Sequence, residues 1–158
     1  MSNPAPSAYI VRPGDGNPLK LRTADVRIKA SAATSGGVLT CVETRDPPGF
    51  LAPAHIHRSS SEAFFVLAGS YKFRIGDDEA ECDAGSFVFV PPGVVHGYTA
   101  GDVDSRLLII YLPPGIEEMW REMQVASAES PLTDKERDAI GRRYDIEWLS
   151  RTRRDRQC

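Results

Sequence analysis

The chain has 158 residues, which is long enough for a single domain with its own hydrophobic core. Hydrophobic residues make up 41% of the sequence and charged residues 26%, and the formal net charge is -3. This balance argues against a surface that binds nucleic acid or an anionic membrane. No apolar run approaches the roughly 20 residues that a membrane-spanning helix needs.

The three cysteines, Cys41, Cys82 and Cys158, are odd in number and far apart. This pattern is typical of free thiols in a reducing compartment rather than of a disulfide framework. The first residues also lack a charged start followed by an apolar stretch, so we expect no secretory signal. Together these features predict a cytoplasmic protein.

Residues 1–19 are rich in proline and poor in apolar side chains, and we expect an extended N-terminal arm there. Residues 20–112 consist of short apolar or alternating segments separated by turns that contain glycine or proline. Strands are predicted at 26–30, 38–44, 63–68, 71–75, 79–82, 87–90, 95–99 and 106–112. Strands of this length and spacing predict an all-β fold, either an antiparallel barrel or a sandwich.

The periodicity changes after residue 115. Apolar residues then recur with helical spacing at Ile116, Met119, Trp120 and Met123. Thr133 with Glu136 three residues later is a capping-box signature, which predicts a second helix running to about Tyr144. We therefore expect a helical extension over residues 113–150 and a basic, solvated tail over residues 151–158.

The sequence has three histidines, and two of them, His55 and His57, are two residues apart. On a strand, side chains at this spacing point to the same face, about 6–7 Å apart along the chain. Glu62 follows a predicted bend, and this bend allows its side chain to turn back toward the same point. A lone histidine is usually a surface or core residue, but a cluster of imidazoles and a carboxylate is able to bind one metal ion.

These residues lie in two segments with glycines at fixed offsets. The first reads Gly49, five residues, His55, one, His57, four, Glu62, six, Gly69. The second reads Gly85, five residues, Pro91, one, Gly93, two, His96, and the position where an asparagine often follows is Ala100. Together the segments resemble the paired signature motifs of the cupin superfamily, over about residues 36–112. The resemblance implies a small antiparallel jelly-roll barrel whose metal ligands are His55, His57, Glu62 and His96.

Three imidazoles and one carboxylate suit a divalent transition metal, namely iron, manganese, nickel, cobalt, copper or zinc. One such ion per chain would keep one or two coordination positions open for a substrate or O₂. Strand alternation places Phe64, Phe73 and Tyr98 on the inner face, where they either pack as core or contact the substrate. An aromatic lining without arginine or lysine argues against phosphorylated sugars and favours an uncharged or phenolic substrate.

The chain is similar to small single-domain cupins of the quercetin 2,3-dioxygenase-like group. This similarity implies a metal-dependent dioxygenase acting on a small phenolic or enolic substrate, with Glu62 as the catalytic base as well as a ligand. Two alternatives stay open. One is a non-redox isomerase, cyclase or lyase that uses the metal as a Lewis acid, and the other is a non-catalytic small-molecule-binding module.

The segment Val26–Ala30 alternates apolar and charged residues and lies outside the two motifs. An uncovered edge strand tends to pair with another chain. Cupins resembling this one commonly pair edge strands across a two-fold axis. We therefore expect a homodimer formed by residues near 20–45, and no nucleic-acid or membrane partner.

Overall fold

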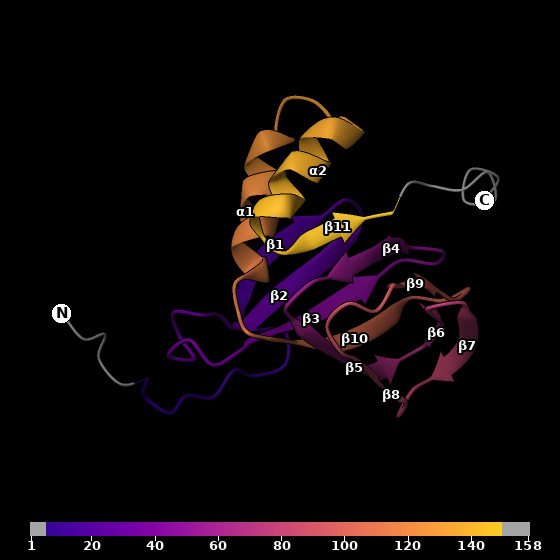
Figure 1. Ribbon diagram of the computed structural model, residues 1–158. Coiled ribbons are helices and arrows are strands. Elements are labelled where there is room, and N and C mark those ends of the chain that lie inside the picture. Colours follow the sequence, from indigo (N-terminus) through magenta and orange to yellow (C-terminus); the bar gives the residue numbers. More distant parts are fainter. Residues whose placement is uncertain (1–5, 150–158) are drawn as a thin grey trace.

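The computed structural model describes residues 6–149 (Figure 1). Within this range the chain forms eleven strands and two helices. The strands are β1 (Asn17–Leu21), β2 (Ala24–Ala30), β3 (Thr40–Asp46), β4 (Leu51–His57), β5 (Ser61–Ala68), β6 (Ser70–Ile75), β7 (Asp78–Asp83), β8 (Phe87–Val90), β9 (His96–Ala100), β10 (Ser105–Leu112) and β11 (Ile146–Trp148). The helices are α1 (Ile116–Ala126) and α2 (Asp134–Arg143). The predicted basic tail, including Cys158, lies outside the described residues.

Two antiparallel sheets form the barrel and confirm the predicted jelly roll. One sheet has the order β1-β2-β3-β10-β5-β8, and the other has the order β11-β4-β9-β6-β7. The inner faces follow the predicted alternation, since every second residue of β10 from Ser105 to Tyr111 is buried. Large buried side chains from both sheets fill the interior, among them Val42, Phe64, Tyr71, Phe73 and Leu107.

The N-terminal part of the large sheet differs from the expectation. Residues 17–19 were assigned to the extended arm, but together with residues 20 and 21 they form β1, which pairs with β2. Proline is unfavourable within a strand, so Pro18 argued against a strand at this position in the sequence. The proline is tolerated because β1 is the edge of its sheet and needs no hydrogen-bond partner on its outer side. The strand β2 is therefore not an edge, because it lies between β1 and β3.

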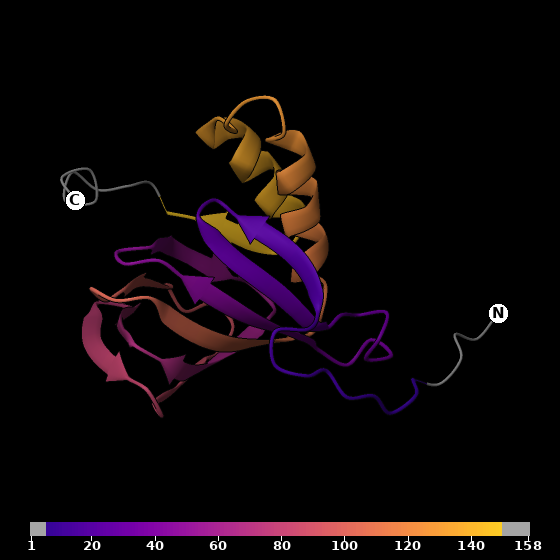
Figure 2. The ribbon, with the colours of Figure 1, turned by 180° about the vertical axis from the view of Figure 1, so that it is seen from behind.

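The helical extension packs against one end of the barrel (Figures 1 and 2). Helix α1 contacts β1, and α2 contacts α1 and β11. The predicted capping box is confirmed, because the Thr133 hydroxyl accepts from the Glu136 N–H and the Glu136 carboxylate accepts from the Thr133 N–H. The predicted apolar face of α1 is also confirmed, with Ile116, Met119 and Trp120 buried.

The start of α1 is fixed to the barrel by a buried carboxylate. Glu117 is fully buried and accepts hydrogen bonds from the Ala32 N–H at 2.7 Å and the Gly115 N–H at 3.1 Å. It also accepts a hydrogen bond from the Thr40 hydroxyl at the start of β3. These bonds hold the extension in a fixed position relative to the barrel.

Cys41 and Cys82 are free thiols, as expected, and both are half-buried. Both lie on strands close to the surface of the barrel. Neither helix described in residues 6–149 is long and apolar enough to cross a membrane.

Candidate metal centre

Two neighbouring strands of one sheet and one strand of the other sheet bring the four predicted ligands together. His55 and His57 lie on β4, Glu62 is the second residue of β5, and His96 is the first residue of β9. His55 and His96 are direct partners in the β4–β9 pairing, so their imidazoles start from adjacent backbone positions. The turn at residues 58–60 reverses the chain and turns the Glu62 side chain toward the histidines.

The ligand atoms of these four side chains lie within 4.8 Å of one another. The Glu62 Oε2 atom is 2.8 Å from His96 Nε2, 3.2 Å from His57 Nε2 and 3.9 Å from His55 Nε2. Ligands at about 2.1 Å from a common metal ion lie at most about 4.2 Å apart. Small side-chain movements are therefore enough for all four atoms to coordinate one ion.

Backbone carbonyls fix two of the imidazoles in the tautomer that a metal requires. His55 Nδ1 lies 2.8 Å from the Pro53 carbonyl, and His96 Nδ1 lies 2.9 Å from the Val94 carbonyl. Carbonyl oxygens only accept, so each Nδ1 carries the proton and donates it. Each Nε2 is then free to present a lone pair toward the centre of the cluster.

The third imidazole carries an unsatisfied atom. His57 Nε2 is buried without a hydrogen-bond partner, although the Glu62 carboxylate is 3.2 Å away. A buried polar atom without a partner costs roughly 1–3 kcal/mol, which a metal ion would relieve. The donor set and this atom both fit a divalent ion, so the cluster could bind a metal.

Burial alone would raise the pKa of the Glu62 carboxyl, but its contacts with the three imidazoles outweigh burial and hold this pKa well below its usual range. Burial lowers the pKa of His55. Burial also acts to lower the pKa of His96, but the Glu62 carboxylate outweighs it and raises this pKa. The Glu62 carboxylate is thus ionised at neutral pH, which is the form that binds a metal ion.

The predicted pocket residues Phe64, Phe73 and Tyr98 pack against one another. Their ring centroids are 5.0–5.8 Å apart, and the Phe64 ring is 6.3 Å from the His96 ring. Phe64 and Phe73 are each 1% exposed, and Tyr98 is 9% exposed. These side chains form the aromatic core beside the cluster, and a contact with substrate stays a prediction.

Sequence reasoning did not identify Tyr111 as a neighbour of the cluster. Tyr111 pairs with Glu62 in the β10–β5 register, and its ring lies 5.9 Å from the His57 ring. Burial raises the pKa of the Tyr111 phenol well above its usual value, and the charge of Glu62 and a hydrogen bond with it act in the same direction. The alternation of Leu107, Ile109 and Tyr111 indicates that this side chain points inward, but only the register places it next to Glu62.

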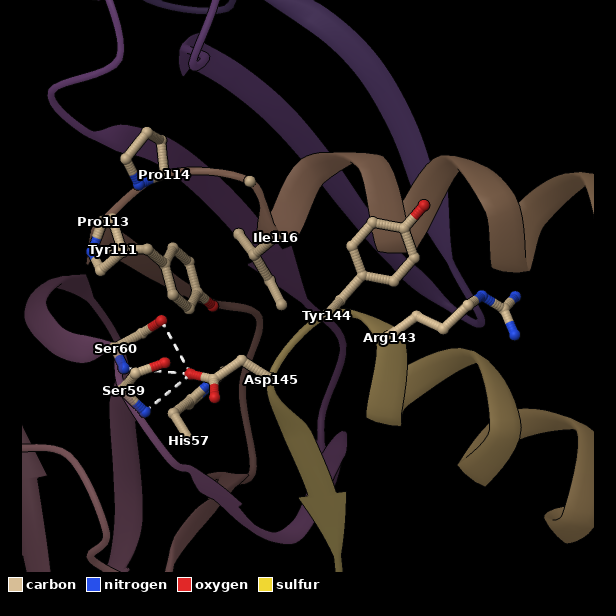
Figure 3. Close-up of a pocket in the computed structure, with 11 residues that line it drawn as sticks. His57, Ser59, Ser60, Tyr111, Pro113, Pro114, Ile116, Arg143, Tyr144 and Asp145 are labelled. Carbon is tan, nitrogen blue, oxygen red and sulfur yellow. Dashed lines mark hydrogen bonds between the residues drawn. The ribbon is translucent and has the colours of Figure 1, made fainter.

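Sequence reasoning also did not identify Asp145 as a residue that contacts the site. It lies between α2 and β11 with a positive φ of 67°, and its Oδ2 accepts from the Ser59 N–H at 2.9 Å and from the Ser60 N–H and hydroxyl, both at 3.0 Å (Figure 3). These serines form the turn between the strand carrying His57 and the strand carrying Glu62. The extension therefore holds the turn that positions two of the predicted ligands.

Comparison with known proteins identifies the barrel. Residues 42–111, from β3 to β10, match the family model of the cupin domain. This segment is thus similar to a cupin domain. A curated relative of the chain, the quercetin 2,3-dioxygenase of Bacillus subtilis (strain 168), is 26% identical over 117 residues, which are 73% of this chain and 34% of that protein. The chain thus spans about a third of this relative's length.

Solved structures support the cupin fold. KdgF from Halomonas sp. matches with a TM-score of 0.64 at 15% identity, covering 71% of this chain and 99% of that chain. The polyketide cyclase RemF from Streptomyces resistomycificus matches with a TM-score of 0.60 at 21% identity, covering 67% of this chain and 80% of that chain. At these identities the likeness shows the fold and does not select an activity.

Proposed function

We propose that the chain is a metal-dependent dioxygenase acting on a small phenolic or enolic substrate. The observation that carries this proposal is the convergence of three imidazole nitrogens and one carboxylate oxygen within 4.8 Å. Four protein ligands leave one or two positions open on a five- or six-coordinate ion, which an oxygenase needs for its substrate and O₂. The weak homology to quercetin 2,3-dioxygenase supports the same class of reaction.

In this proposal His55, His57, His96 and Glu62 hold one divalent ion of iron, manganese, nickel, cobalt, copper or zinc. Such an ion supplies Lewis acidity and, when it is redox-active, electron exchange with O₂. Glu62 accepts the hydroxyl proton of the substrate at its carboxylate. Because the pKa of Glu62 is low, this transfer requires a substrate hydroxyl that is acidified at the site.

The first experiment is elemental analysis of protein purified without added metal, followed by oxygen-electrode assays with flavonols and smaller enols. We expect a near-stoichiometric divalent transition metal and oxygen consumption coupled to loss of the enol. Metal-loaded protein that converts an enol without consuming oxygen would favour the Lewis-acid isomerase or cyclase instead. Metal-loaded protein that binds these compounds unchanged would favour a binding module.

The second experiment separates the two roles of Glu62. Glu62→Gln keeps the size and one ligand oxygen but loses the basicity, so we expect retained metal and turnover lowered by about 10²–10⁴-fold. Glu118→Gln is the matched control, because Glu118 is exposed on α1 and pairs with Arg121. Metal-loaded Glu62→Gln with near-normal oxygen uptake would exclude Glu62 as the base.

A further inference from the structure

A cavity of about 250 Å³ lies between the barrel and the helical extension (Figure 3). The barrel contributes His57, the turn serines Ser59 and Ser60, and Tyr111. The segment after β10 and the extension contribute Pro113 to Ile116 and Arg143 to Asp145. The cavity is therefore built from three parts of the chain that are distant in sequence.

This cavity reaches the proposed metal centre through two side chains. His57 is one of the four clustered residues and also lines the cavity. Tyr111 lines the cavity as well; it lies opposite Glu62 in the β10–β5 register, and its ring is 5.9 Å from the His57 ring. A molecule in the cavity would thus lie beside one residue of the cluster and beside the phenol paired with another.

The charges around the cavity favour an uncharged occupant. The Arg143 guanidinium pairs with Glu122 and donates to the Ala139 carbonyl at 3.0 Å, and in Figure 3 it extends away from the space that Tyr111, Ile116 and Asp145 surround. Burial acts to raise the pKa of Asp145, but its hydrogen bonds with the turn serines outweigh burial and lower this pKa, so the carboxylate is ionised. An anionic ligand would meet this carboxylate without a free cation among the residues that line the cavity.

The volume of the cavity also limits the size of the ligand. Ligand pockets usually measure about 300–1,000 Å³, so a volume of about 250 Å³ suits a ligand smaller than a typical drug-sized molecule. The walls combine apolar surface from Pro113, Pro114 and Ile116 with the hydroxyl groups of Tyr111 and Ser60. A single aromatic or enolic ring that carries hydroxyl groups matches both the volume and the lining.

The geometry points to this cavity as the substrate site: it binds a neutral, single-ring phenol or enol whose hydroxyl reaches the cluster beside Tyr111. This inference rests on the proposed metal-dependent function and adds the route, the charge and the size of the substrate. It assigns Tyr111 the role of orienting the substrate hydroxyl toward Glu62. Three-ring flavonols are expected to bind less well, because pockets that hold ligands of that size usually measure about 300–1,000 Å³.

The test measures ligand binding separately from turnover. Zinc-loaded protein is titrated with 4-nitrocatechol at a pH below the first pKa of the free compound, so that the free ligand is neutral. Its absorption changes when a hydroxyl ionises on binding, and the zinc content of every variant is measured in parallel. Ser59→Trp fills the cavity from an exposed position whose backbone N–H still donates to Asp145. Ser130→Trp is the matched control on the exposed loop between α1 and α2, outside the cavity.

We expect Ser59→Trp to keep its zinc but bind 4-nitrocatechol at least ten-fold more weakly, and Ser130→Trp to match the wild type. Tyr111→Phe keeps the ring and should weaken binding about five-fold, the value of one hydrogen bond. Quercetin should bind the wild type at least five-fold more weakly than 4-nitrocatechol.

Zinc-loaded Ser59→Trp with wild-type affinity would overturn the assignment of the cavity and leave the metal centre intact. Tighter binding of quercetin than of 4-nitrocatechol would overturn the inference that the substrate has a single ring. Wild-type protein that retains no divalent metal would overturn the proposed function, and this inference with it.

Discussion

Replacing Asp46 with asparagine is expected to remove a large pH-dependent contribution to folding stability. Asp46 ends β3 and is 1% exposed. Its Oδ2 accepts hydrogen bonds from the Tyr71 hydroxyl at 2.9 Å and the Thr44 hydroxyl at 3.0 Å, while its Oδ1 is buried without a partner. Burial raises the pKa of Asp46 from 3.8 to about 6, although the two hydrogen bonds act to lower it.

The direction of the effect follows from this shift. The folded protein favours the neutral carboxyl, so the stabilisation from Asp46 is fully present below the unfolded pKa of 3.8 and is lost as the pH rises through about 6. A shift from 3.8 to about 6 corresponds to about 3 kcal/mol at 1.36 kcal/mol per pKa unit. Asparagine cannot ionise, and its side-chain oxygen still accepts from Tyr71 and Thr44.

The assay is urea unfolding of metal-free protein in chelator, at intervals from about pH 4 to about pH 8. Chelation removes the pH dependence that metal binding would add. Relative to the wild type, Asp46→Asn should gain about 2.5 kcal/mol between the two ends of this range, because part of the effect is already present at about pH 4; this corresponds to roughly 5–10 °C in melting temperature. The exposed residue Asp102 supplies the control Asp102→Asn, which should follow the wild type. Parallel stability curves for Asp46→Asn and the wild type would refute this reasoning.

Three further outcomes are expected. Free metal at about 100 times its dissociation constant should stabilise the wild type by about 2.7 kcal/mol, so chelation should lower its melting temperature, and His57→Ala should show no such dependence. Thr133→Ala should cost about 1 kcal/mol through loss of the α2 cap, measured by urea unfolding, and an unchanged midpoint would contradict this. We also propose a homodimer through residues near 20–45 and the β1 edge, and a mass near 17 kDa by light scattering would contradict it.

Local patterns carried most of the information about the fold. Alternation in segments such as β6 and β10 and the turns between them predict the strands, because period 2 and turn chemistry are properties of neighbouring residues. The capping residues Thr133 and Glu136 predict the start of α2 for the same reason. The ligand cluster was predicted from the resemblance to the paired cupin motifs: the first motif contains His55, His57 and Glu62, and the second contains His96.

The strands that the sequence did not predict form by pairing with other strands of the fold. Pro18 argued against a strand at β1, and this strand forms through its five-residue register with β2. The strand β11 has three residues, too few for a recognisable alternation, and it forms because it can pair with β4 opposite His57 and His55. No pattern within residues 146–148 indicates this partner.

The same long-range pairing joins the extension to the proposed metal centre. Through β11 the extension adds a strand beside the two histidines of β4, and through Asp145 it satisfies two backbone N–H groups of the turn before Glu62. Asp145 and Ser60 are 85 residues apart, so this contact forms only when the extension docks on the barrel. A turn held at both ends loses less conformational freedom when its flanking ligands converge on an ion. If His57 and Glu62 bind a metal ion as proposed, the docked extension would lower the entropic cost of that binding, and it also forms one wall of the cavity that His57 lines.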